Sequence, residues 1–187
     1  MILSNKVTQK PLIVLGIDPG TRRAGWSIIQ YDHAGLRLIA LDTLSLSPSL
    51  PLPTRVGIFG EFMAKLLEKH NITAIALETA FVAKNAQTFH KLGFLRGVLY
   101  YLAYQKSCVI TELAPMQVKQ AITGWGAAPK EQVARVLHQL FPTLPAQQHE
   151  DATDALAVAL AGLWQLQQQA LVAQSQFKPA NTKDLAQ

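Results

Sequence analysis

Apolar residues fall along the chain in short runs separated by turn residues, and the first three runs lie close together. Residues 12–17 form an apolar run that ends in Asp18, and a turn containing Pro and Gly leads to a second run at 26–31. This pattern predicts a buried strand, a tight turn and a returning strand. After a further turn at 33–35, residues 36–43 predict a third strand.

The pattern then changes to helical spacing before it returns to a strand. Residues 45–53 contain three prolines and predict a loop, because proline disrupts both helices and central strands. Residues 55–70 carry apolar residues at intervals of three and four, which predicts a helix ending at Asn71. Residues 73–77 predict a fourth strand, which ends in another carboxylate, Glu78.

The second half of the chain is mainly helical. Residues 85–105 predict a long helix with a narrow apolar seam formed by Phe89, Leu92, Leu95, Leu99 and Leu102. The seam could pack on the sheet or against the same helix of a second copy, and we expect a mixture of the two. The remaining predicted elements are a strand at 108–113 and helices at 116–122, 130–141 and 151–167.

The order of these elements predicts an α/β fold. Two short connections followed by two helix-containing crossovers give three antiparallel strands and then two strands parallel to the first. We therefore expect a five-stranded mixed sheet of order 3-2-1-4-5 with helices on both faces. Residues 12–168 would form this domain, after an N-terminal extension at 1–11 and before a disordered tail at 169–187.

Composition supports a globular protein and indicates the cellular compartment to expect. Of the 187 residues, 49% are hydrophobic and 16% are charged. No apolar run reaches the roughly 18 residues of a membrane span, and residues 1–11 lack the apolar core of a signal peptide. Cys108 is the single cysteine, so one chain forms no disulfide, and we expect a reducing, cytoplasmic setting. The net charge of +5 permits a polyanionic partner without establishing one.

Four carboxylates fall at the ends of predicted elements. Asp18 and Glu78 end strands predicted to be parallel neighbours, so both would emerge at one edge of the sheet. Asp151 and Asp154 open the last helix three residues apart and share one face. Each acid also has an ordinary explanation as a turn or helix cap. If the last helix packs beside the first strand, all four carboxylates meet. Glu150 is interpreted as flanking this cluster, but it could take the place of Asp151 in the cluster if the helix begins earlier.

Such a cluster needs positive charge or protons. Two charges about 4 Å apart repel by roughly 4 kcal/mol at an effective dielectric constant of 20. Either some acids are protonated or cations hold them together. Oxygen ligands without cysteine select hard ions, Mg²⁺ with Mn²⁺ as a substitute. Two such ions about 4 Å apart suit phosphodiester displacement, in which one activates water and the other stabilises the leaving oxygen.

Basic residues flank the same edge. Each alone is interpreted as a solvated surface charge, but as a set near the carboxylates they would balance phosphate charge. They are Arg22, Arg23, Lys84, Lys91, Lys119 and Lys130. His90, His138 and His149 show no metal-ligand spacing and are interpreted as surface residues. His149 lies beside the acids and is a candidate contact for a phosphate or a water molecule.

Four blocks of sequence, in this order and at this spacing, resemble the RuvC family of Holliday junction resolvases. The blocks are GIDPGTRRAG, ALETAFVAKNAQTFHKLGFLRG, LAPMQVKQAITGWG and DATDALAVAL. The resemblance covers roughly residues 12 to 165. It implies a ribonuclease H-like fold, a homodimer, and Mg²⁺-dependent paired nicks in four-way DNA junctions that leave 5′-phosphate and 3′-hydroxyl ends. The family's RuvA and RuvB branch-migration complex is a candidate partner.

The resemblance also assigns roles to individual residues. The family's catalytic acids, which bind two metal ions, carry over to Asp18, Glu78, Asp151 and Asp154. Lys119 and Lys130 would bind or polarise the scissile phosphate. The DNA contacts implied together by the blocks and the charges are Arg22, Arg23, Phe81, Lys84, Asn85, Lys91, Lys119 and Lys130. Phe81 looks like the family's stacking wedge near the junction centre, and a buried loop phenylalanine is an equally good interpretation.

The chain departs from the family pattern at three places. Thr79 follows the catalytic Glu where the family usually has Gln, and residues 88–91 read Thr-Phe-His-Lys in place of Ser-Ala-Leu-Lys. Trp125 occupies the Gly-rich loop where a small or aliphatic residue is common. The first and third of these changes, at Thr79 and Trp125, concern DNA contacts and leave the cleavage-site preference open.

Two other classes of function fit parts of the sequence. GIDPGT also resembles the phosphate loops of actin-like kinases, but that fold needs two such halves and a longer chain. An inactive junction-binding scaffold is the other alternative, although all four acids are present. A nicking assay on a synthetic four-way junction separates the three hypotheses.

Overall fold

A computed structural model describes residues 10–79, 86–145 and 147–176, and these residues contain one mixed β-sheet. Its strands are β1 (Leu12–Asp18), β2 (Arg23–Asp32), β3 (Gly35–Ser45), β4 (Ala74–Glu78) and β5 (Val109–Leu113). The strand order is β3-β2-β1-β4-β5, with β1, β2 and β3 antiparallel and with β4 and β5 parallel to β1. The predicted sheet order is therefore confirmed.

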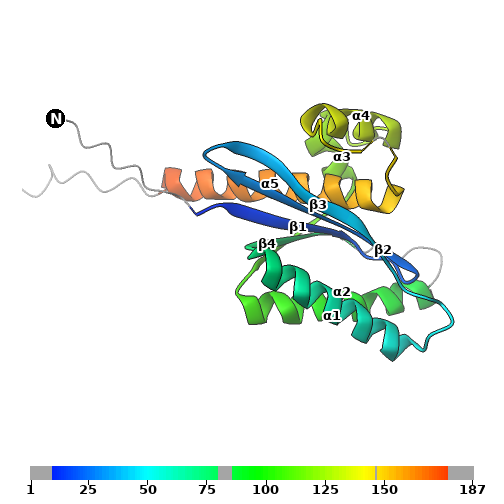
Figure 1. The fold of residues 1–187 in the computed structure, drawn as a ribbon. Helices are drawn as coiled ribbons and strands as arrows, with labels where there is room; N and C mark the ends of the chain where they lie inside the picture. The colour runs from blue at the N-terminus through cyan, green and yellow to red at the C-terminus, as the bar shows by residue number, and fades with distance from the viewer. Residues whose placement is uncertain (1–9, 80–85, 146, 177–187) are drawn as a thin grey trace, which may run out of the picture.

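Helices cover both faces of this sheet, as predicted (Figure 1). The helices are α1 (Leu52–His70), α2 (Ala86–Lys106), α3 (Pro115–Thr123), α4 (Lys130–Leu140) and α5 (Glu150–Gln176). Helices α1 and α2 lie on one face, and α5 lies on the other with α3 and α4 packed outside it. None of the helices in the described ranges is long and apolar enough to cross a membrane.

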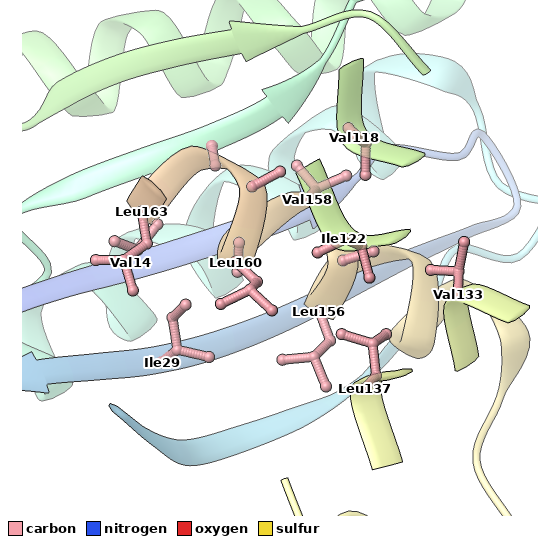
Figure 2. Packing of buried hydrophobic residues seen from close by; sticks show 14 of the residues in the cluster. Val14, Ile29, Val118, Ile122, Val133, Leu137, Leu156, Val158, Leu160 and Leu163 are labelled. Carbon is pink, nitrogen blue, oxygen red and sulfur yellow. The ribbon is translucent and has the colours of Figure 1, made fainter. Parts of the chain in front are cut away.

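Alternate residues of each inner strand enter two different cores, because successive side chains point to opposite faces. The core under α5 takes Val14, Ile29, Ala74 and Ala76 from the strands, and Leu156, Leu160 and Leu163 from α5 (Figure 2). The core under α1 and α2 takes Leu15, Ile17, Ile28, Ile75 and Leu77. Since side chains alternate, Asp18 in β1 and Glu78 in β4 belong to the face that α5 covers.

Most observed boundaries lie within three residues of the predicted ones: β2 begins three residues early, at Arg23, and α5 one residue early, at Glu150. Helix α1 begins at Leu52 inside the predicted loop, because Pro53 lies in the first turn, where a missing N–H breaks no helical hydrogen bond. Its end at Asn71, which has a left-handed φ of 51°, is as predicted.

Helix α5 continues to Gln176, whereas the sequence was expected to become a disordered tail from residue 169. The residues concerned are mainly Ala, Leu, Val and Gln without Gly or Pro, so nothing in their conformational preferences ends the helix. The rest of the predicted tail, 177–187, and the extension at 1–9 lie outside the described residues.

Candidate active site

Two of the predicted acids meet because their strands are parallel neighbours. Strands β1 and β4 pair in register up to Ile17 and Leu77, and Asp18 and Glu78 are the next residues of each strand. Both strands end at the same edge of the sheet, and both side chains belong to the face under α5. Each acid is half-buried.

Helix α5 supplies the other two acids because it packs unusually close to β1 and β2. An added Cβ at Gly16 would lie 2.3 Å from the Ala155 carbonyl oxygen, and one at Gly25 would lie 1.9 Å from that of Asp151. The buried Ser27 hydroxyl donates a 3.0 Å hydrogen bond to the Ala155 carbonyl. The missing side chains of the two glycines therefore bring the first turn of α5 against the strand ends.

The electrostatics of Asp18 show that the four carboxylates act on one another. Burial, followed by the negative charges of Asp154, Glu78 and Asp151, raises the pKa of Asp18 from 3.8 to about 6. Burial and the charge of Asp154 also raise the pKa of Glu78. The structure thus brings together the four acids that the sequence analysis selected.

Lys130, the first residue of α4, is the main cation at this cluster. Its Nζ donates a 2.9 Å hydrogen bond to Asp154 Oδ2 and a further short hydrogen bond to Glu150. These bonds raise the pKa of Lys130 and lower that of Glu150. Glu150 therefore binds the lysine and flanks the cluster, while Asp151 acts on Asp18. Lys119 in α3 is half-buried, and its charge opposes the rise in the pKa of Glu78.

Two arginines hold the turn between β1 and β2. The Arg23 guanidinium lies 3.9 Å from Asp151 Oδ2 and 3.2 Å from His149 Nδ1, so Arg23 links the turn to the start of α5. The buried Arg55 of α1 donates a 2.7 Å hydrogen bond to the carbonyl of Thr21. Arg22 is exposed. His90, His138 and His149 are all exposed, as interpreted from the sequence.

The remaining predicted contacts are more scattered. Lys91 is half-buried in α2, and Trp125 is exposed after α3. The Thr79 hydroxyl is buried and has no hydrogen-bond partner among the described residues. Phe81, Lys84 and Asn85 lie outside the described residues, so their predicted DNA contacts stay predictions.

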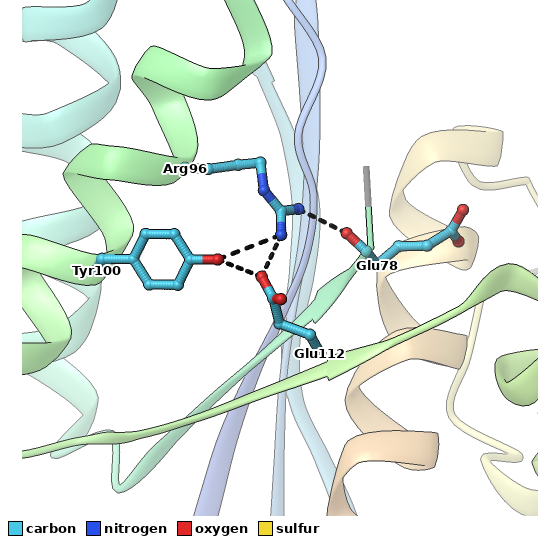
Figure 3. Close-up of polar contacts among 4 residues, drawn as sticks. All are labelled: Glu78, Arg96, Tyr100 and Glu112. Carbon is cyan, nitrogen blue, oxygen red and sulfur yellow. Dashed lines mark hydrogen bonds and ion pairs between the residues drawn. The ribbon is translucent and has the colours of Figure 1, made fainter. Parts of the chain in front are cut away.

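Sequence reasoning missed a polar network on the other side of Glu78. Arg96 of α2 donates a 2.6 Å hydrogen bond to the main-chain carbonyl of Glu78 and pairs with Glu112 of β5 (Figure 3). The Tyr100 hydroxyl donates to the same Glu112 oxygen. A signal was present, because Arg96 interrupts an apolar helix and Glu112 interrupts an apolar strand, but their pairing depends on the fold.

The donor chemistry of the acid cluster fits a hard divalent cation. All four side chains offer carboxylate oxygens, which Mg²⁺ and Mn²⁺ prefer, and their mutual repulsion favours a bound cation. Across the described ranges, no three His, Cys, Asp or Glu side chains already form a metal cage. The four carboxylates therefore lie close enough to act on one another electrostatically without yet forming a closed set of ligands. The cluster is therefore a carboxylate site with suitable ligands in an open arrangement, in which the Lys130 ammonium neutralises Asp154.

The chain resembles known proteins over most of the described residues. The sequence model of one family, described as crossover junction endodeoxyribonuclease RuvC, matches residues 14–162. The RuvC of Chlorobium chlorochromatii (strain CaD3) is 36% identical over 152 residues, which are 81% of this chain and 79% of that protein. The RuvC of Halorhodospira halophila (strain DSM 244 / SL1) is 41% identical over 149 residues, which are 79% of this chain and 87% of that protein.

Solved structures agree with this match. T. thermophilus RuvC in complex with Holliday junction substrate superposes with a TM-score of 0.78 at 28% identity, covering 84% of this chain and 96% of that one. The yeast mitochondrial Holliday junction resolvase Ydc2 superposes with a TM-score of 0.60 at 16% identity, which shows a shared fold. The predicted ribonuclease H-like fold is therefore confirmed.

Proposed function

The chain belongs to the RuvC family of crossover junction endodeoxyribonucleases, and from this membership we propose that it resolves four-way DNA junctions by metal-dependent hydrolysis. Its substrate would be a Holliday junction, as in the complex of T. thermophilus RuvC. Its products would be paired symmetric nicks with 5′-phosphate and 3′-hydroxyl ends.

One observation carries the proposal: carboxylates from β4 and α5 act together on Asp18 of β1, and with burial they raise its pKa to about 6. A structural role does not account for this arrangement, because gathering like charges at a half-buried edge destabilises the fold. Such a cost is typical of a functional site. The phosphodiester backbone of DNA is a substrate on which bound divalent cations act directly.

Asp18, Glu78, Asp151 and Asp154 would hold two Mg²⁺ ions, for which Mn²⁺ would substitute. Bound Mg²⁺ would activate the attacking water and neutralise charge on the leaving oxygen. The protein's own part is to hold the four carboxylates at one edge, where the raised pKa of Asp18, about 6, still leaves this carboxyl group mainly ionised at neutral pH. The parallel pairing of β1 with β4 and the close packing of α5 on β1 and β2 provide that fixed geometry.

Two lysines would supply positive charge to the scissile phosphate. The Lys130 ammonium lies on Asp154, so it can exchange this contact for a phosphate oxygen when cations neutralise the acids. Lys119 stands near Glu78 on the other side of the cluster, as its effect on the pKa of that residue indicates. Arg22 and Arg23, on the turn beside Asp18, would contact flanking phosphates.

A homodimer would place two such sites on one junction. Helix α2 supports this part of the proposal because it combines a buried seam with exposed aromatic residues. Leu95, Leu99 and Leu102 are buried in the core, whereas Tyr101 is 59% exposed and Tyr104 is 85% exposed. Exposed aromatic residues on one helix are typical of a protein interface. A RuvA and RuvB branch-migration complex would be a further partner.

Cleavage of a synthetic four-way junction tests the proposal. Wild-type protein with Mg²⁺ should nick two opposing strands, and Asp154→Asn should not, because the variant loses a carboxylate of the cluster. Asp42→Asn, which changes an exposed acid in β3, is the matched control and should cut normally.

Junction binding in Ca²⁺ should persist in Asp154→Asn, because the contacts to phosphate remain. Full activity of that variant would remove the metal-site assignment. Binding without cleavage by the wild-type protein would indicate an inactive scaffold.

A further inference from the structure

We propose that Arg96 is a positioning residue for catalysis, which acts by fixing the main chain of Glu78 so that its carboxylate faces α5. The proposal rests on the catalytic role of Glu78 in the proposed function. Arg96 does not belong to the acid cluster, and it lies on α2, on the opposite face of the sheet from α5.

The contact between the two residues is direct. One guanidinium nitrogen of Arg96 donates a 2.6 Å hydrogen bond to the carbonyl oxygen of Glu78. Figure 3 shows this carbonyl pointing to Arg96 and the Glu78 side chain pointing away from it toward the helix on the other face. A charged donor at this distance is among the stronger hydrogen bonds in proteins. The N–H of the same peptide group, from Thr79, donates a 2.8 Å hydrogen bond to the Leu113 carbonyl of β5, so Arg96 and β5 together define the orientation of the peptide group that follows Cα of Glu78.

Glu78 needs such an anchor because of where it lies. It is the last residue of β4; it still pairs with Leu113 of β5, but on the β1 side it lies beyond the final pair, Ile17 with Leu77. Strand ends move more freely than strand centres. A rotation of this last peptide group would turn the side chain away from the cluster, and a displacement of about 1 Å at a catalytic group lowers rates by about 100-fold.

The guanidinium of Arg96 is itself held in place. It pairs with the Glu112 carboxylate of β5, and the Tyr100 hydroxyl donates to the same carboxylate oxygen. Arg96 is 9% exposed, so its charge is buried, and its guanidinium contacts the Glu78 carbonyl and the Glu112 carboxylate. The network thus joins α2 and β5 to the end of β4. Residues 96 and 100 lie one helical turn apart, which brings both side chains to one carboxylate.

A purely structural ion pair is the competing explanation, and it makes a different prediction. If Arg96 only stabilises the packing of α2 on the sheet, its replacement lowers stability and leaves the folded enzyme active. If Arg96 positions Glu78, its replacement weakens the metal site and slows cleavage in molecules that remain folded.

The experiment uses Arg96→Met, which removes the donors and keeps an unbranched apolar stem, and Arg96→Lys, which keeps one charged donor. Leu102→Ala is the matched control, because Leu102 is buried in the same helix and makes no polar contact with Glu78. Glu78→Gln serves as the reference for loss of the carboxylate. Each variant is assayed at a temperature at which its circular dichroism shows a folded protein.

Three quantities are measured: the single-turnover cleavage rate at saturating junction and Mg²⁺, the junction Kd in Ca²⁺, and Mn²⁺ binding to the DNA-free protein by electron paramagnetic resonance. Arg96→Met should cut about 10- to 100-fold more slowly with a Kd within about twofold of wild type. Its Mn²⁺ affinity should fall toward that of Glu78→Gln. Arg96→Lys should recover part of both losses, and Leu102→Ala should show neither.

Mn²⁺ affinity separates this proposal from the proposed function. If the wild-type protein does not cut junctions but Arg96→Met and Glu78→Gln both lose Mn²⁺ affinity, the positioning role stands and the proposed reaction fails. Wild-type Mn²⁺ affinity in Arg96→Met overturns the positioning role, whatever the cleavage rate. If the wild-type protein does cut junctions, a cleavage rate of Arg96→Met equal to that of Leu102→Ala also overturns it.

Discussion

Replacing Gly25 by alanine should disable the active site while the fold survives. Gly25 lies opposite Asp18 in the β1–β2 ladder, directly under the first turn of α5. A Cβ at this position would lie 1.9 Å from the carbonyl oxygen of Asp151. Since real Cβ contacts are essentially never below 3.0 Å, β2 and α5 must separate by at least 1.1 Å.

This separation sets the expected size of the effect. Overpacking of this kind costs about 1–3 kcal/mol, and a domain of this size loses about 2–4 °C of Tm per kcal/mol. The same displacement moves Asp151 and Asp154 away from Asp18, so the cleavage rate should fall by about 100-fold. The variant should therefore remain folded at the assay temperature while it cuts about 100-fold more slowly.

The assay compares single-turnover junction cleavage with thermal unfolding. Gly57→Ala in α1 is the control, because a Cβ there meets nothing within 4 Å, and it should cut normally with an unchanged or slightly raised Tm. Gly25→Ala that is folded and cuts at the wild-type rate would refute the idea that close seating of α5 builds the site.

Three further predictions concern charge and assembly. Because the pKa of Asp18 is raised in the folded state, its ionisation costs stability as pH rises from about 4 to 6. In EDTA at pH 7.5, the free energy of unfolding of Asp18→Asn should therefore exceed that of wild type by up to about 3 kcal/mol, with no difference below pH 4. Thermal unfolding measures this, and equal stability of the two proteins at both pH values would contradict it. At saturating junction, Lys130→Met should slow cleavage by about 10- to 100-fold. Lys65→Met, which replaces an exposed lysine in α1, should cut at the wild-type rate. Equal rates for the two variants would remove Lys130 from the site. Tyr104→Glu should raise the dimer dissociation constant at least about tenfold in sedimentation equilibrium, whereas Ile39→Glu on β3 should not, and an unchanged dimer would exclude this face of α2.

The sheet and the positions of two acids could be predicted from the sequence because they depend on local patterns. Short turns and helical crossovers determine the strand order, and a carboxylate directly after a buried strand must emerge at the strand end. Asp18 and Glu78 follow from these two rules alone. The two acids of α5 were selected because they open the last predicted helix on one face, but their meeting with Asp18 was conditional on where that helix packs, and the family resemblance assigned their catalytic role.

The rest depends on contacts between distant elements. The approach of α5 is set by side chains that are absent at Gly16 and Gly25, and a sequence does not show which glycines lie under a helix. Arg96 looked like one basic residue in an apolar helix until β5 brought Glu112 to it. Similarly, Glu150 could be assigned to Lys130 only once α4 and α5 were placed together.

The predicted end of α5 was wrong for a different reason. Its apolar, core-facing positions stop near residue 163, so the pattern of burial suggested an end soon afterwards. The backbone continues as an exposed helix because its residues favour that conformation and no helix breaker follows until after Gln176. Apolar periodicity reports where a helix is buried and not where it ends.

Anomalous diffraction from crystals grown with Mn²⁺ tests the central claim most directly. The account predicts anomalous peaks between the carboxylates of Asp18, Glu78, Asp151 and Asp154, with the Lys130 ammonium displaced from Asp154. Crystals with the Lys130–Asp154 pair intact and no peak among these acids, at Mn²⁺ concentrations that support cleavage, would contradict it.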